Sequence, residues 1–177
     1  FTPFTMFDKP ILLSEQVSLF NLILAELRDE KLQADRLRFR FNMERAGELL
    51  ALELSRHLEY VDTDVTTPLG TCPTPVLQEY PVLVAILRAA LALQTGFLRM
   101  YDRSDNAFIS AYRRHTNKDE FVIEVEYVSA PDLNDRTIVM LDPMIATGRS
   151  MVLSYQEILR FGTPKRVFIC GVIASDE

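Results

Sequence analysis

Several common motifs are absent from this chain, and each absence excludes a class of protein. No Gly-x-x-x-x-Gly-Lys-[Ser/Thr] loop occurs, so the chain lacks the phosphate-binding loop of P-loop nucleoside triphosphatases. No Gly-x-Gly-x-x-Gly follows an apolar run, so it also lacks the fingerprint of dinucleotide-binding proteins. The longest apolar run, residues 81–93, is interrupted by Arg88 and is shorter than the about 20 residues that a transmembrane helix needs. We therefore expect no membrane span, and the sequence contains no internal repeat.

Cysteine is also scarce, and the 19 basic residues are outnumbered by 25 acidic ones. Cys72 and Cys170 are far apart, and no Cys-x-x-Cys or Cys/His cluster exists, so we expect no structural zinc and a reducing, cytoplasmic setting. Cys170 lies in an apolar run and is expected to be a buried thiol. The net charge of −6 argues against a general nucleic-acid or membrane surface. Residues 1–13 are apolar but lack a basic n-region, and we do not interpret them as a signal peptide.

The spacing of apolar residues predicts alternating helices and strands in one domain, residues 1–177. The apolar content of 48% is enough for a substantial core. Helices are predicted over residues 14–28, 35–57, 89–100 and 150–161. Strands are predicted over residues 61–68, 82–87, 107–112, 121–128, 138–141 and 167–173, with loops over 70–75 and 113–120. This alternation is typical of an α/β fold with a mostly parallel sheet, whose ligands lie beyond the carboxyl ends of the strands.

The most informative segment is residues 138–154, IVMLDPMIATGRSMVLS. An apolar strand ends at Asp142, a turn of small residues follows, and a helix is predicted to begin near Ser150. Such a turn directs backbone N–H groups inward and the helix N-terminus adds partial positive charge, which together can bind a phosphate. Asp142 can accept hydrogen bonds from sugar hydroxyls, and Thr147 and Ser150 can donate them. The alternative is an ordinary strand-to-helix turn that binds nothing.

Residues 142–150, DPMIATGRS, resemble the loop that binds phosphoribosyl pyrophosphate (PRPP) in type I phosphoribosyltransferases, in the version of the uracil phosphoribosyltransferase family. Other stretches are similar to the same family: PVLVAILRAAL (81–91), SAYR (110–113), TPLG (67–70), RD (28–29) and FR (39–40). The resemblance covers about residues 14–175. It implies a mostly parallel central sheet flanked by helices, with N-terminal helices and a flexible β-hairpin loop, whose place is taken by residues 113–120.

The resemblance also implies an activity: transfer of the phosphoribosyl group of PRPP to uracil, giving UMP and pyrophosphate in pyrimidine salvage. Such a pentosyltransferase is cytoplasmic, works as a homodimer to which the N-terminal helices contribute, and uses Mg²⁺ held mainly by the substrate rather than by protein ligands. Arg88 would bind the pyrophosphate, Arg113 would also reach PRPP, and Asp142 would hold the ribose hydroxyls. The remaining residues of the implied PRPP site are Pro143, Met144, Ile145, Ala146, Thr147, Gly148, Arg149 and Ser150. The alternatives are a buried ion pair for Arg88 and an ordinary surface role for Arg113.

Three positions depart from the family pattern. Arg149 stands where uracil enzymes usually have Gly, so it could add a charge to the phosphate contact or block it. Ala90 replaces the usual Gly of the pyrophosphate loop, which costs roughly 1 kcal/mol or more if the position needs φ > 0. The segment that reads uracil in the family, Tyr-[Ile/Val]-x-Pro-Gly-Leu-Gly-Asp-Ala-Gly-Asp, does not occur before Glu177. Two alternatives stay open: a non-catalytic, PRPP-binding regulatory protein, and a phosphoribosyltransferase for another base.

Overall fold

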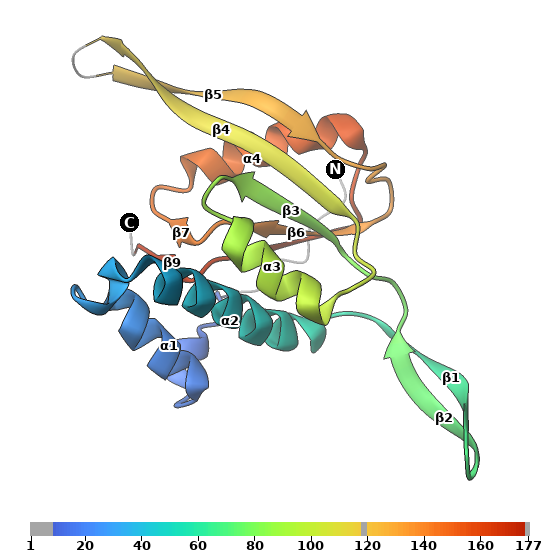
Figure 1. Ribbon diagram of the computed structural model, residues 1–177. Coiled ribbons are helices and arrows are strands. Elements are labelled where there is room, and N and C mark those ends of the chain that lie inside the picture. The colour runs from blue at the N-terminus through green and yellow to red at the C-terminus, as the bar shows by residue number, and fades with distance from the viewer. Residues whose placement is uncertain (1–8, 118–119, 176–177) are drawn as a thin grey trace.

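A five-stranded sheet forms the centre of the protein (Figure 1), in a computed structural model that describes residues 9–117 and 120–175 but not the side chains of residues 111–125. The strand order is β5-β4-β3-β6-β8. The bounds are β3 (Val82–Leu87), β4 (Asn106–Asn117), β5 (Glu120–Ser129), β6 (Thr137–Leu141) and β8 (Arg166–Cys170). Strand β3 pairs in parallel with β4 and β6, β6 pairs in parallel with β8, and β5 is antiparallel to β4. The expected α/β fold with a mostly parallel sheet is confirmed.

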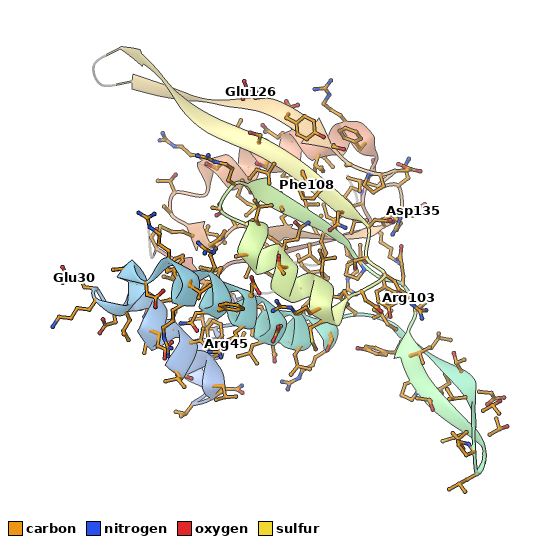
Figure 2. All side chains as sticks on the ribbon, in the orientation of Figure 1. Glu30, Arg45, Arg103, Phe108, Glu126 and Asp135 are labelled. Atoms are coloured by element: carbon orange, nitrogen blue, oxygen red, sulfur yellow. The ribbon has the colours of Figure 1, made fainter. Side chains whose placement is uncertain are left out.

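Helices cover both faces of this sheet (Figure 1). Helices α1 (Leu19–Arg28), α2 (Arg36–Ser55) and α3 (Leu91–Met100) lie on one side, and α4 (Arg149–Ile158) lies on the other. Side chains of a strand alternate between the two faces, so Leu83 joins the α1–α3 core whereas Val84 joins the α4 core. Phe108 of β4, labelled in Figure 2, packs against the first of these cores. Short 3₁₀ helices span Leu13–Glu15, Leu32–Ala34 and Leu159–Phe161.

Capping residues set the starts of the first two long helices. The side chain of Asp35 accepts hydrogen bonds from the N–H groups of Leu37 and Arg38, which starts α2 where the sequence predicts it. Helix α1 begins later than predicted, because Ser18 rather than Ser14 is its cap: the Ser18 hydroxyl accepts from the N–H of Phe20 at 3.2 Å. None of the helices in the described part of the chain is long and apolar enough to cross a membrane.

A two-stranded hairpin, β1 (Tyr60–Thr67) and β2 (Gly70–Leu77), projects from the body (Figure 1). The prediction of a loop over residues 70–75 is therefore wrong. Pro73 and Pro75 suggested a loop, but both strands of an isolated ribbon are edge strands, where proline is tolerated. Strand β1 is exposed along its whole length, so no burial pattern marks this hairpin in the sequence.

Two further predictions about the strands need correction. Residues 113–117 belong to β4 and Glu120 to β5, so the predicted polar loop over 113–120 is not a loop at these positions, and residues 118–119 lie outside the described part of the chain. The predicted strand over 167–173 is two strands, because the chain leaves the main sheet after Cys170. The second of them, β9 (Ile173–Ala174), pairs in parallel with β7 (Met144–Ile145).

Candidate functional site

Three parallel strands deliver polar loops to one end of the sheet. Ala85 of β3 is in register with Leu141 of β6, and Leu141 is in register with Cys170 of β8. The residues that follow these strands therefore lie at one edge, and β7 lies toward the end to which the arrowhead of β3 points (Figure 1). Ligands of α/β sheets bind at this edge, outside the carboxyl ends of the strands.

Asp142 leaves the end of β6 as a half-buried carboxylate. Its own N–H donates to the carbonyl of Cys170 at 3.2 Å, which fixes its backbone to the neighbouring strand. Burial raises the pKa of Asp142 above its ordinary value, and the N–H of Met144, which donates to Oδ1 at 3.3 Å, opposes that rise. The carboxylate keeps unused acceptor capacity that a ligand with hydroxyl donors can satisfy.

The loop after Asp142 ends at an uncapped helix. Gly148 is the N-cap residue of α4 with φ of +69°, a conformation that favours glycine, and it has no side chain to accept from the first N–H groups. The first turn of α4 contains no acidic residue. A Cβ placed on Gly148 would meet nothing within 4 Å. The first N–H groups of α4 thus have no side-chain cap, and the space beside Gly148 is open, a combination that suits an anion.

Arg88 and Ala90 lie where β3 passes into α3. Arg88 is exposed and makes no ion pair with any described residue, so the alternative of a buried ion pair is wrong. The peptide bond between Leu87 and Arg88 is cis. Ala90 is fully buried with φ of −74°, so the penalty for a positive φ at this position does not apply. The exposed guanidinium of Arg88 can meet a second anionic group at the same edge as Asp142.

Arg113 is in the backbone of β4, in register with Ile123 of β5. Its side chain lies outside the described residues, so its role stays a prediction. Cys170, expected to be a buried thiol, is half-buried, and burial raises its pKa to about 12. This keeps the thiol protonated and unreactive at neutral pH.

Sequence reasoning missed the segment that follows β8, residues 171–175. The carbonyl of Pro143 accepts hydrogen bonds from the N–H groups of Val172 and Ile173, each at 3.1 Å. Ser175 donates hydrogen bonds to two carbonyl groups further along the same loop. No local signal could have found these contacts, because they join positions about thirty residues apart through strand pairing.

The described residues contain no group of three or more His, Cys, Asp or Glu side chains able to hold a metal ion. Asp142 supplies a carboxylate at the loop. This donor set fits Mg²⁺, which keeps several waters and takes one or two carboxylates together with the phosphates of a substrate.

Solved structures define the class of this fold. The AQ2163 protein from Aquifex aeolicus matches with a TM-score of 0.80 at 24% identity, covering 92% of this chain and 76% of that one. A hypoxanthine phosphoribosyltransferase from Staphylococcus aureus matches with a TM-score of 0.53 at 12% identity, covering 76% of this chain and 64% of that one. The fold is that of the type I phosphoribosyltransferases.

Sequence comparison narrows the class to one family. The family model described as uracil phosphoribosyltransferase matches residues 14–177. The uracil phosphoribosyltransferase of Porphyromonas gingivalis is 44% identical over 165 residues, which are 93% of this chain and 76% of that protein. The uracil phosphoribosyltransferase of Thermococcus gammatolerans is 32% identical over 158 residues, 88% of this chain and 69% of that protein. The chain belongs to the uracil phosphoribosyltransferase family.

Proposed function

We propose that this protein transfers the phosphoribosyl group of PRPP to uracil, giving UMP and pyrophosphate. The observation that carries the proposal is the loop from Asp142 to Gly148, which sets a half-buried carboxylate beside the uncapped N-terminus of α4. A ribose with vicinal hydroxyls and a phosphate matches these two features in chemistry. Membership of the family supports uracil as the acceptor.

The proposed roles follow from the charges that PRPP carries. The N–H groups at the start of α4 bind the 5-phosphate, and Asp142 accepts hydrogen bonds from the ribose hydroxyls. As the bond from the anomeric carbon to the pyrophosphate oxygen breaks, that oxygen keeps the electron pair. A ring nitrogen of uracil bonds to the carbon and releases its proton to water. Arg88 and Arg113 stabilise the growing negative charge on the pyrophosphate. Mg²⁺, when bound with the substrate, would supply further positive charge to that group. The full proposed PRPP site is Arg88, Arg113, Asp142, Pro143, Met144, Ile145, Ala146, Thr147, Gly148, Arg149 and Ser150.

Turnover measured by chromatography tests the proposal. The purified protein is incubated with PRPP and Mg²⁺ and, in separate reactions, with uracil, adenine, hypoxanthine or orotate. We expect UMP from uracil and no nucleotide from the other bases. A product from another base alone would reassign the acceptor. Thermal stabilisation by PRPP with no product from any base would identify the non-catalytic alternative instead.

We further propose that the chain acts as one domain in a homodimer. Leu19 and Leu22 of α1 are 69% and 59% exposed, and a second subunit is a suitable cover for such apolar side chains. Light scattering during gel filtration should give about twice the chain mass of 20.3 kDa, and a monomer would contradict the proposal.

A cytoplasmic location is supported by the exposed free thiol of Cys72, which suits a reducing compartment.

A further inference from the structure

The loop proposed to bind PRPP is hydrogen-bonded to the segment after β8, residues 171–175. Met144 and Ile145 of β7 pair in parallel with Ile173 and Ala174 of β9, so the first half of the loop is a short strand rather than a free turn. The second half has no strand partner. Its direction is set by the groups that donate hydrogen bonds to the carbonyls of residues 145 and 146.

Ser175 makes both of those contacts. Its N–H donates to the carbonyl of Ile145 at 3.0 Å, and its hydroxyl donates to the carbonyl of Ala146 at 3.0 Å. In a trans peptide the C=O and the following N–H point in opposite directions within one plane. Fixing the carbonyls of residues 145 and 146 toward Ser175 therefore turns the N–H groups of Ala146 and Thr147 away from it.

Those two N–H groups have no acceptor within the described part of the chain. They precede Gly148, where the backbone turns at φ of +69° into α4. The hydroxyl of Ser175 is thus the last contact from the segment 171–175 before the chain reaches the uncapped helix. Loss of that contact would allow the Ala146–Thr147 peptide to rotate, and it would leave the packing of the core unchanged.

Gly171 shows how closely the two segments approach. A Cβ at Gly171 would lie 2.8 Å from Cδ1 of Ile145 and 3.0 Å from the carbonyl oxygen of Asp142. The first of these atoms is the far end of a flexible side chain that can move aside. The second belongs to the loop backbone, so a larger residue at Gly171 would press on the loop at Asp142. The segment therefore supports the loop through a close backbone contact at one end and the Ser175 hydrogen bonds at the other.

We propose that Ser175 is a positioning residue for phosphate binding: its hydroxyl orients the Ala146–Thr147 peptide so that the Thr147 N–H points at the 5-phosphate of PRPP. Ser175 acts through the loop and does not itself touch the substrate. The inference rests on the proposed function, because it assumes that the 5-phosphate occupies this loop.

Calorimetry with two separate probes, ribose 5-phosphate and pyrophosphate, tests the proposal on the whole chain. Ser175→Ala removes one exposed hydrogen bond, so the Kd for ribose 5-phosphate should rise about 3- to 10-fold. The Kd for pyrophosphate should not change, because that group is assigned to Arg88. In turnover, the KM for PRPP should rise while kcat stays within a factor of two of the parent value, as expected for loss of uniform binding (about equal in ground and transition states). Ser175→Thr, which keeps the hydroxyl, should restore the parent values.

A matched control is Ser55→Ala, which removes another exposed hydroxyl-to-carbonyl hydrogen bond, from Ser55 to Leu52 at 2.6 Å near the end of α2. It should leave both Kd values unchanged. Gly171→Ala is a second variant, and it should weaken ribose 5-phosphate binding without weakening pyrophosphate binding. Equal affinity of Ser175→Ala and the parent for ribose 5-phosphate, or equal weakening of both probes, would overturn the positioning role. Failure of the parent protein to bind ribose 5-phosphate would instead overturn the proposed function.

Discussion

Asp142 sits half-buried at the end of β6, and its raised pKa means that the folded protein disfavours the ionised carboxylate. Between the ordinary value of 3.8 and the raised pKa, the folded state binds more protons than the unfolded state. The free energy of unfolding therefore falls as the pH rises through that window. The proposed binding role needs the ionised form, which accepts hydrogen bonds from ribose hydroxyls, so PRPP affinity should change in the opposite direction.

This opposition gives a prediction for Asp142→Asn. Loss of charged hydrogen bonds worth about 1.5–3 kcal/mol each should lower kcat/KM by roughly 10- to 100-fold, while the melting temperature at pH 7 stays the same or rises. The pH profile of PRPP binding in the parent should show an acid limb above 3.8 that is missing from the variant. An acid limb at the same pH in both proteins would show that another group titrates there.

Gly148 combines a backbone requirement with open space, and Gly70 offers the same combination in the turn of the β1–β2 hairpin. Both have positive φ, +69° and +136°, and a Cβ on either would meet nothing within 4 Å. Alanine should lower the free energy of unfolding by about 1 kcal/mol at each position, which is about 2–4 °C in Tm for a chain of this size. Gly148→Ala alone should also weaken PRPP binding, at least 10-fold by calorimetry, because its methyl group enters the space assigned to the phosphate. Equal PRPP affinities of the two variants would place the phosphate elsewhere.

At the scale of elements, helices α2 and α3 cross at two glycines. A Cβ on Gly96 would lie 2.9 Å from Cα of Gly47 and would also clash with the carbonyl of Glu44, so the two backbones are in direct contact. Gly96→Ala should separate the helices and lower the free energy of unfolding by about 1–3 kcal/mol, measured in urea. Thr95→Ala, an exposed neighbour on the same helix, should change it by less than about 0.5 kcal/mol. Equal stability of the two variants would mean that the crossing adjusts without strain.

The same elements show what the sequence can predict. Strands β3 and β6 were predicted almost to the residue because they are buried on both faces, so each is an uninterrupted apolar run. Strand β2 was missed because it is largely exposed and pairs outside the body, where burial leaves no pattern. In the candidate site, the loop from Asp142 to Ser150 was found because its residues are contiguous. Ser175 was not, because strand pairing alone brings it to the loop.

At the scale of the whole molecule, Glu79 joins segments that are far apart in sequence. It follows the projecting hairpin, whose side chains Figure 2 shows along β1 and β2. The Glu79 carboxylate pairs with Arg136, which precedes β6, at 2.7 Å and with Lys165, which precedes β8, at 2.8 Å. The ammonium of Lys165 donates a hydrogen bond to the Glu79 carboxylate, and this bond raises the pKa of Lys165 above its ordinary value. The base of the hairpin is thus tied to the amino-terminal ends of β6 and of the edge strand β8.

Glu79→Gln should therefore weaken the attachment of the hairpin to the sheet. We expect a loss of about 1 kcal/mol of unfolding free energy, near the upper end for partly exposed ion pairs, because one carboxylate serves two cations. The fall in Tm should be about 2–4 °C at low salt and should shrink by at least half in 1 M NaCl, where screening is strong. Glu157→Gln is the control, since Glu157 pairs with Arg160 at 3.0 Å on one short stretch of surface, and its effect should stay below about 0.5 kcal/mol. A Glu79→Gln protein as stable as the control at every salt concentration would show that the hairpin is held by its backbone alone.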